Sequence, residues 1–356
     1  MDFRPTEDQK ALAGAVRGVL GKHRSPGAPG EEGPEPGAGG ADGAGGMGGV
    51  GGVDPALWRD LAELGVFGLR VPEEAGGLGA GHAESVHVFE ELGRALATGP
   101  YTATALAAPL LPEYASGRHR VGLSDLTNGA PYYLEHLDSL DALLVVEVVD
   151  GAARIQVLRV EPVELRADPV PYPVDPCVPL HRLRQKPLRG EIIGDAATAG
   201  ALLREGALLT AAYQVGMAAV LTERAVAYAK QRTQFGRAIG SFQAVKHLCA
   251  DMFARAELAR AAVHSAAVLL DDDRADRDGA DLPAAATEVS AATAVSAAKI
   301  LADDAAVANA RAAIQVHGGM GCTWEMGLHY FLKRAWALSL AYGRAAEHAD
   351  LISEAL

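Results

Sequence analysis

The sequence predicts a mixed, mainly α-helical protein with a small β domain between two helical parts. Three observations support this prediction. Apolar residues recur with helical spacing near both ends of the chain. Between them the period changes, and two runs rich in β-branched residues flank Asp150-Gly151, a pair that favours a hairpin turn. After Leu202 proline is almost absent, which is typical of a helical bundle with short connections.

The first helical part is expected to span residues 1–118. Thr6 and Gln9 have the spacing of a capping box, so a helix should start there. Residues 25–53 are almost entirely Gly, Pro, Ala and Glu, which predicts a disordered surface loop because such a segment buries little apolar surface. Two further helices are expected in this part, one capped by Asp54 with Pro55 in its first turn and one at about Ala83–Ala97.

The middle part, residues 119–200, is predicted to be a small β domain. The last part, residues 201–356, is predicted to be a bundle of four or five amphipathic helices. The second of these carries Phe242, Val245, Leu248, Met252 and Leu258, which we expect to form its apolar face. The expected helices lie at about Ala207–Gln231, from about Ser241 onward, and at about Ala285–Val316, 324–335 and 337–355.

Composition excludes several classes of protein. The chain has 356 residues and is 49% hydrophobic, enough for two or three domains with cores. It has no apolar run of about 18 residues, so no membrane span is expected, and its N-terminus lacks the apolar core of a signal peptide. A net charge of −13 argues against nucleic-acid binding. The three distant cysteines, Cys177, Cys249 and Cys322, lack zinc-site spacing and predict reduced thiols, no metal and a cytoplasmic location.

Three motifs in this order resemble the acyl-CoA dehydrogenase family, and the resemblance covers most of the chain. "LWRDLAELGVFGLRVPEEAGGLGAG" resembles the N-terminal helical signature. "YAKQRTQFGRAIGSFQAVKHLCADM" and "AIQVHGGMGCTWEMGLHYFLKRA" resemble the two C-terminal motifs. The resemblance implies an N-terminal helical domain, a middle β domain, a C-terminal four-helix bundle and the cofactor FAD.

The resemblance also implies which residues contact FAD, mainly the FAD bound by a neighbouring subunit. The planar donor fork of Arg232 suits the pyrophosphate, with Gln234 and Phe235 beside it. Gln243 and Gln315 can hydrogen-bond the ribose or adenine, and Gly318 and Gly319 allow close approach of the backbone. Simpler roles stay open: Arg232 as a helix C-terminal cap, Gly318-Gly319 as a helix stop, and Phe235 and Phe242 as partly core residues.

The base expected in this family is missing from its usual place. Dehydrogenation needs a carboxylate that removes the α-proton of the acyl thioester, commonly in a Glu-Gly-Thr turn. Here Tyr342-Gly343-Arg344 stands at that position, and a tyrosine, with a pKa near 10, is a poor base. In other members the base lies early in the long helix before the quoted motif, where Gly206 occupies the matching position. Glu205 beside it is a candidate, or else a first-turn acid that the helix dipole favours.

A second part expected in this family is also missing. The Thr-Glu-Pro and Gly-Ser-Asp motifs that line the flavin do not occur between Leu110 and Leu144, so the β domain looks truncated. The groups that would reach a neighbour's flavin are kept. This pattern resembles the short subunits of actinobacterial two-gene acyl-CoA dehydrogenases, which form α2β2 heterotetramers and act on steroid side-chain CoA thioesters.

The leading hypothesis is therefore a half-site, non-catalytic subunit of a heteromeric FAD-dependent acyl-CoA dehydrogenase. Its implied partners are a longer catalytic subunit that shares the FAD across the interface, a bulky acyl-CoA, and electron-transfer flavoprotein or a similar acceptor. Two alternatives stay open: a self-sufficient dehydrogenase with Glu205 as base, and a helical scaffold that has lost FAD.

Overall fold

The chain folds into two compact units, each built from segments distant in sequence. The computed structural model describes residues 5–23, 52–127, 129–149, 154–161, 165–184, 190–279 and 284–355. The helical unit comprises Met1–Gly49, His82–Ala97 and Ala207–Leu356, and the sheet unit comprises Val50–Gly81 and Thr98–Gly206. Most of the predicted loop at residues 25–53 lies outside the described residues. None of the described helices is long and apolar enough to cross a membrane.

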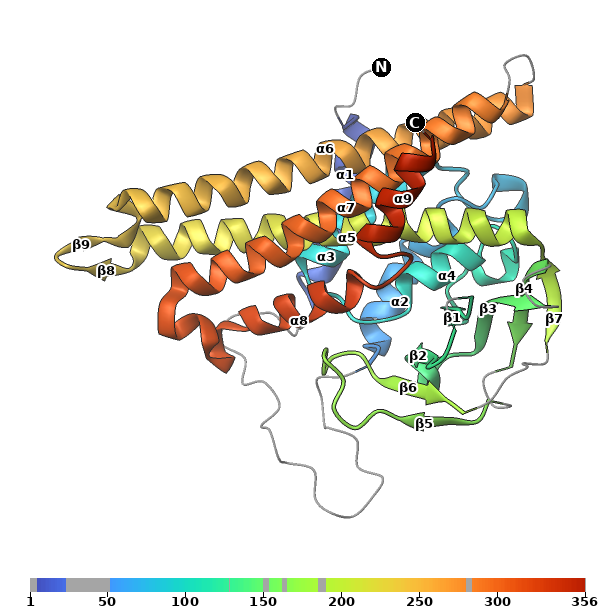
Figure 1. Ribbon diagram of the computed structural model, residues 1–356, viewed down its shortest axis with the longest axis horizontal. Helices are drawn as coiled ribbons and strands as arrows, with labels where there is room; N and C mark the ends of the chain where they lie inside the picture. The colour runs from blue at the N-terminus through green and yellow to red at the C-terminus, as the bar shows by residue number, and fades with distance from the viewer. Residues whose placement is uncertain are drawn as a thin grey trace. The chain divides into compact units, whose positions relative to one another are not determined.

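The helical unit is dominated by three long helices that run side by side (Figure 1). Short connections make consecutive long helices antiparallel, as the sequence predicts for a bundle. The core between them is rich in alanine, so the helix backbones lie close together. The helices of this unit are α1 (Glu7–Leu20), α3 (His82–Arg94), α5 (Ala196–Gln231, from Ala207 onward), α6 (Gln243–Gly279), α7 (Ala284–His317), α8 (Leu328–Leu338) and α9 (Ala345–Ala355). Leu258 of α6 is 58% exposed, so the expectation that it belongs to the buried apolar face of this helix is wrong.

Several predicted helix boundaries are confirmed, and two are wrong. The helix expected at 337–355 begins only at Ala345, because a turn with positive φ at Tyr342 and Gly343 precedes it. Thr6 and Gln9 form both hydrogen bonds of a capping box at α1, and Asp54 caps α2 (Pro55–Glu63). The helix expected from about Ala207 begins eleven residues earlier, at Ala196. Asp195 explains the difference, because its carboxylate accepts hydrogen bonds from the backbone and side chain of Thr198, as an N-cap does.

α3 and α5 cross at direct backbone contact. A Cβ at Gly216 of α5 would lie 1.9 Å from the carbonyl oxygen of Glu90, and one at Gly93 of α3 would lie 1.8 Å from that of Tyr213. Only glycine permits so close an approach of two backbones. This crossing holds α3 inside the helical unit.

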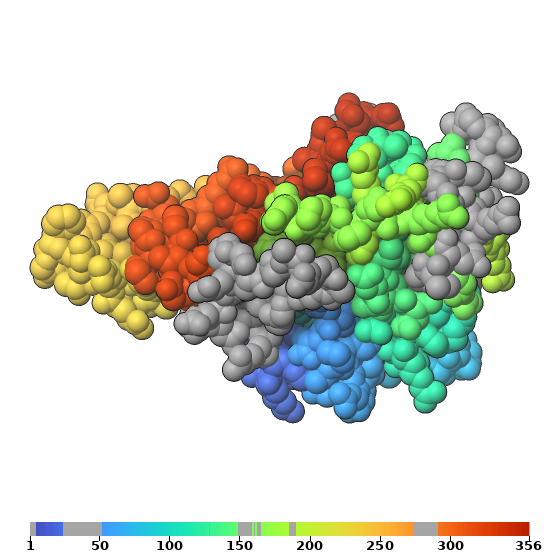
Figure 2. All heavy atoms as spheres, turned by 90° about the horizontal axis from the view of Figure 1, so that it is seen from below, coloured from blue at the N-terminus to red at the C-terminus, as the bar shows by residue number. Residues whose placement is uncertain are grey.

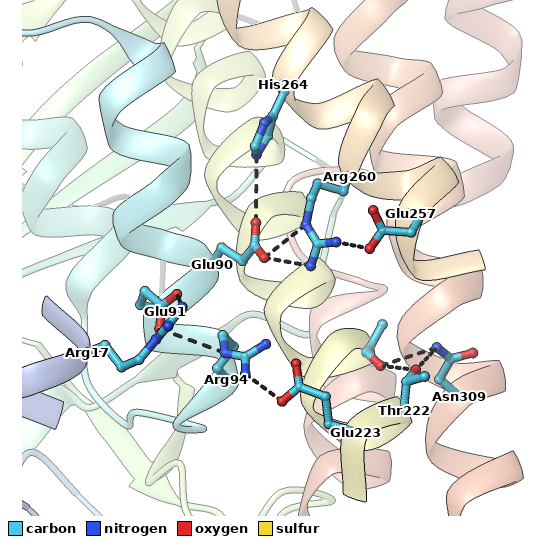
Figure 3. A network of polar contacts seen from close by, with 11 residues as sticks. Arg17, Glu90, Glu91, Arg94, Thr222, Glu223, Glu257, Arg260, His264 and Asn309 are labelled. Carbon is cyan, nitrogen blue, oxygen red and sulfur yellow. Dashed lines mark hydrogen bonds and ion pairs between the residues drawn. The ribbon is translucent and has the colours of Figure 1, made fainter. Parts of the chain in front are cut away.

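Ion pairs surround this crossing (Figure 3). Glu90 pairs with Arg260 of α6 at 2.7 Å, and Glu91 pairs with Arg17 of α1 at 2.5 Å. Arg94 pairs with Glu223 of α5 at 2.6 Å. The three pairs join α3 to three different helices, so they fix its position in the unit.

The sheet unit contains two small sheets among its described residues. The predicted hairpin around Asp150-Gly151 is present as an antiparallel pair of β3 (Ala142–Val149) and β4 (Arg154–Val160), with the connecting turn outside the described residues. The four-stranded sheet has the order β1-β3-β4-β7, with β1 parallel to β3, and the three-stranded sheet has the order β2-β6-β5. The other strands are β1 (Val121–Asp125), β2 (Tyr133–Glu135), β5 (Ala167–Pro169), β6 (Leu180–Leu183) and β7 (Glu191–Gly194).

Apolar side chains from both sheets form one core, which includes Leu126, Leu134, Leu143, Val145 and Leu183. A second cluster fixes α2 and α4 (Tyr101–Ala107) in the same unit. The ring of Trp58 stacks on Phe67 at 4.3 Å and on Tyr101 at 5.2 Å, and its indole nitrogen donates to the carbonyl oxygen of Gly117 at 2.7 Å. Stacked aromatic rings and a satisfied indole donor stabilise this end of the unit.

Candidate nucleotide-binding site

A tight hairpin joins α5 to α6. Its strands are β8 (Thr233–Gln234) and β9 (Arg237–Ala238). Phe235 and Gly236, at the two turn positions, have φ of 51° and 75°, which makes a type I′ turn. A bulky residue with positive φ is strained, and here its ring is also 91% exposed. The expectation that Phe235 is partly a core residue is therefore wrong, because the turn directs its ring away from the bundle.

The cations around this hairpin are exposed and make no ion pair with any described residue. They are Lys230, Arg232, Arg237 and Lys246, and we call them the cation cluster. The guanidinium of Arg237 lies 4.1 Å from the ring centre of Phe242, which contacts Phe235 edge-on at 6.1 Å. Four unpaired cations beside an aromatic pair, in a chain of net charge −13, can bind an anion without first breaking an internal ion pair.

The side chain of Arg232 makes no hydrogen bond within the described part of the chain, so it does not act as a helix cap. Only its backbone is fixed, with the amide donating to the carbonyl of Tyr228 at 2.8 Å and the carbonyl accepting from Ile239 at 2.8 Å. The side chain of Gln234 donates to the carbonyl of Thr233 at 2.7 Å. Gln243 is exposed in the first turn of α6. The side chains of Arg232, Gln234 and Gln243 thus lie around a hairpin whose backbone is fixed by hydrogen bonds.

The second glycine-containing motif follows α7. Gly318 has φ of 61°, so it does end the helix, and a 3₁₀ helix (Gly318–Cys322) follows. A Cβ added at Gly318 or Gly319 would meet no atom within 4 Å, and both glycines and Gln315 are exposed. A side chain at either position would therefore not clash with the rest of the chain. The backbone at these glycines is open, so a ligand can approach it closely.

A stacking contact brings the two motifs together. Tyr228, one turn before Arg232, stacks on His317 at 4.2 Å, and Gly318 follows His317 directly. His317 is buried, its Nδ1–H donates to the carbonyl of Ala313 at 2.7 Å, and burial lowers its pKa, so its ring is neutral. Figure 2 shows the yellow segment around the hairpin at the surface, beside the orange-red segment that follows α7. No pattern in the sequence indicates this contact.

The two positions considered for the missing base, Glu205 and Tyr342, have defined surroundings in the structure. Glu205 lies in the third turn of α5, not its first, and its carboxylate pairs with the buried Arg70 at 2.7 Å. The alternative that the helix dipole explains Glu205 is therefore wrong. The carboxylate is therefore engaged in an ion pair with a buried guanidinium.

The turn at Tyr342 is held by a buried histidine that sequence reasoning missed. Tyr342 and Gly343 have φ of 55° and 102°, and the imidazole of His348 packs directly against Gly343. Its Nε2–H donates to the carbonyl of Tyr342 at 3.1 Å, and its Nδ1 contacts the hydroxyl of Ser296 at 3.2 Å. Burial lowers the pKa of His348, so it holds the turn as a neutral ring.

The same face of α7 carries a buried ion pair. Lys299 contacts both carboxylate oxygens of Asp303 at 2.8 Å and donates to the carbonyl of Leu338 at 3.2 Å, and Asp303 accepts from Gln214 at 2.6 Å. A charged i,i+4 pair inside an alanine-rich helix is the signal that could have identified this contact from the sequence. It joins α7 to α5 and to the end of α8.

The site can hold an anion next to planar groups, which is the chemistry of a dinucleotide. Unpaired guanidinium groups match a pyrophosphate, exposed rings match a planar base, and side-chain amides match ribose or base edges. The residues fit the nucleotide end of FAD on these grounds.

The fold defines a class by its architecture, namely helical proteins with a small β domain inserted between two helical parts. Residues 46–120 match the N-terminal domain of acyl-CoA dehydrogenases and residues 196–356 match the C-terminal domain. Acyl-CoA dehydrogenase IpdE2 of Mycobacterium tuberculosis is 33% identical over 93% of this chain and 92% of its own length. The chain belongs to the acyl-CoA dehydrogenase family, which is FAD-dependent.

Other relatives differ in length or assembly. Acyl-CoA dehydrogenase FadE34 of M. tuberculosis is 36% identical over 77% of this chain, but the chain spans only 38% of its length. The ChsE4-ChsE5 complex of M. tuberculosis has the same fold, with a TM-score of 0.75 and 24% identity over 99% of this chain and 98% of that one. The Tcur3481-Tcur3483 steroid ACAD also shares it, with a TM-score of 0.76 and 22% identity over 98% and 97%.

Proposed function

We propose that this chain is the half-site subunit of a heteromeric acyl-CoA dehydrogenase and holds the nucleotide end of an FAD whose reactive ring lies in a longer partner subunit. The single observation that carries this proposal is the unpaired cation cluster beside the strained, exposed Phe235. A folded protein rarely keeps such a ring in a left-handed turn without a ligand or partner.

Each residue has a distinct task in this proposal. Arg232 binds the pyrophosphate through its fork of donors, and Phe235 presents a ring to the planar base, with Gln234 beside it. Gln243 and Gln315 hydrogen-bond the ribose or adenine, and the open backbone at Gly318-Gly319 lies against the nucleotide. A bound flavin supplies the acceptor for the hydride from the β-carbon of the acyl group.

The proton chemistry is assigned to the partner. Tyr342 stands where the base would be, and a phenol is a poor base at neutral pH. Glu205 is engaged by Arg70. The shared fold with two solved two-chain assemblies supports a heteromer, and the name of one of them supports a steroid side-chain acyl-CoA as substrate class. Electron-transfer flavoprotein or a similar carrier would then reoxidise the flavin.

The test measures flavin in the assembly purified from the source organism. We expect one flavin per two chains, and we expect the chain alone to be colourless. Arg232→Ala should weaken flavin binding about 10- to 100-fold, because a charge-assisted hydrogen bond contributes about 1.5–3 kcal/mol. Arg59→Ala, which removes an exposed arginine of α2, is the matched control and should leave flavin content unchanged.

Two results would refute the proposal. If the isolated chain is yellow, oxidises acyl-CoA and loses that activity on Glu205→Gln, the chain is a self-sufficient enzyme. If Arg232→Ala leaves the flavin content of the assembly unchanged, the chain is a scaffold that does not touch the nucleotide.

A further inference from the structure

The two parts of the candidate nucleotide-binding site lie at the ends of two different helices. Arg232 directly follows α5, and Gly318-Gly319 directly follow α7. Because α6 runs antiparallel to both, α5 and α7 run in the same direction, and their C-terminal ends lie on the same side of the helical unit (Figure 1). A ligand that contacts both ends requires a fixed separation between them.

A buried side-chain amide ties α5 to α7 further back along the bundle (Figure 3). Asn309 of α7 is fully buried and donates to the hydroxyl of Thr222 on α5 at 3.2 Å and to the carbonyl of Met252 on α6 at 2.8 Å. The helices continue for up to about two turns beyond this contact before they reach Tyr228 and His317. The last turns of a helix open more easily than its middle, so these ends need a contact of their own.

The stacking of Tyr228 on His317 supplies that contact. The ring centres are 4.2 Å apart and the ring planes meet at 24°. The ring of His317 is also held at its edge, since its Nδ1 contacts the carbonyl of Ala313 at 2.7 Å. Burial and the nearby positive charge of Arg224 lower the pKa of His317, so the ring stacks without burying a charge of its own.

Tyr228 acts on both parts of the site, through different atoms. Its carbonyl accepts a hydrogen bond from the amide of Arg232 at 2.8 Å, which fixes the backbone of the arginine. Its ring lies on His317, whose next residue is Gly318. Its hydroxyl makes no hydrogen bond with any residue that the structure describes. The ring and the backbone of Tyr228, and not its hydroxyl, therefore connect the two helix ends.

We propose that Tyr228 and His317, which we call the stacking pair, hold Arg232 and the Gly318-Gly319 turn at the separation that one nucleotide spans. Both are positioning residues, because they act through the groups that bind the nucleotide. This role rests on the proposed function and adds two residues to it. A pair that served packing alone would affect the stability of the bundle and leave nucleotide affinity unchanged in the folded protein.

The test measures the dissociation constant of flavin in the assembly purified from the source organism, with circular dichroism to show that each variant is folded. Tyr228→Leu should weaken flavin binding about 3- to 10-fold, because it removes a stacked aromatic contact. Tyr228→Phe keeps the ring and should bind flavin as the unchanged chain does. Tyr133→Leu, which removes an exposed ring from β2, is the control and should have no effect.

A double-variant cycle shows whether the two rings act together. His317→Leu should weaken flavin binding about as much as Tyr228→Leu, and the double variant should be no weaker than either, because all three lose the same contact. In an Arg232→Ala background the effect of Tyr228→Leu should shrink, since one of the groups that it positions is gone. If Tyr228→Leu does not fold, His317→Leu and Tyr228→Phe decide the question in its place.

Three results would overturn this role. They are unchanged flavin affinity in folded Tyr228→Leu or His317→Leu, an equal loss in Tyr228→Phe, and additive losses in the double variant. If one of these is found while Arg232→Ala still weakens flavin binding, the stacking pair is refuted and the proposed function stands. If Arg232→Ala also leaves flavin binding unchanged, the proposed function fails as well.

Discussion

The close crossing of α3 and α5 at glycines predicts that a glycine-to-alanine substitution in α5 has opposite effects on stability at two positions, Gly216 and Gly200. In Gly216→Ala, the new Cβ would lie 1.9 Å from the carbonyl oxygen of Glu90, whereas real Cβ atoms essentially never approach within 3.0 Å. The two backbones must therefore separate by at least 1.1 Å, the difference between those distances. In Gly200→Ala, on the same helix, the Cβ meets nothing within 4 Å.

The magnitudes follow from these contacts. Alanine in a helix is favoured over glycine by about 1 kcal/mol. At Gly216 this gain is outweighed by overpacking, about 1–3 kcal/mol, because the obstacle is backbone and not a flexible side chain. Separation would also loosen the matching contact at Gly93. We expect Gly216→Ala to lower the free energy of unfolding by up to about 2 kcal/mol, and Gly200→Ala to raise it by about 0.5–1 kcal/mol.

Urea denaturation followed by circular dichroism measures both variants against the unchanged chain. The midpoint should fall for Gly216→Ala and rise for Gly200→Ala, with similar slopes. If Gly216→Ala is as stable as the parent chain, the helices do not cross at backbone contact, and the reasoning about α3 is wrong.

Three further outcomes are expected. Burial lowers the pKa of His87 to about 4, whereas in the unfolded chain a histidine takes up a proton below about pH 6.5. The free energy of unfolding should therefore fall as the pH drops from about 6.5 to 4, by at most about 3 kcal/mol. His87→Phe should reduce this pH dependence. Lys299→Met leaves Asp303 buried without its cation and should cost about 3–5 kcal/mol, seen as a lower melting temperature. Phe235→Asn relieves the left-handed turn and should leave stability unchanged or raise it by up to about 1 kcal/mol, while weakening FAD retention in the assembly.

The first two of these outcomes have a matched comparison. Glu90, beside His87, is buried, which raises its pKa, but His264 and Arg260 outweigh burial and lower it to about 2, so its own loss of stability begins only below about pH 4.5. A slope that persists in His87→Phe above pH 5 would exclude His87 as its cause. Adding Asp303→Leu to Lys299→Met should restore stability, and failure to do so would show that the lysine acts otherwise than by charge compensation.

Much of the fold could be predicted from local signals. The cap at Thr6 and the hairpin strands of β3 and β4 depend on residues close in sequence, and the structure confirms them. The start of α5 differs from the expected one by eleven residues, although the sequence contains the signal of a cap at Asp195.

The turn that carries the candidate site was predictable from the sequence, but the geometry of its side chains was not. The spacing of Arg232, Phe235 and Gln243 places them around one turn, and the structure agrees. The exposure of Phe235 depends on the positive φ angles of Phe235 and Gly236, which cannot be predicted from an apolar side chain. The stacking of Tyr228 on His317 joins helices far apart in the chain, and no local pattern encodes such a contact.

The interleaving of the two units has a consequence for how this protein is made. The sheet unit ends at Gly206, whereas the helical unit draws on three segments and needs the last part of the chain. During synthesis the strands can pair before α5 and α6 have been made, so α1 and α3 at that stage lack the helices that complete their unit. A fragment cut at residue 196, where the match to the C-terminal domain begins, would lack α3 and leave Arg260 without Glu90. Such a fragment should aggregate, so domain dissection of this protein requires co-expressed pieces rather than a single cut.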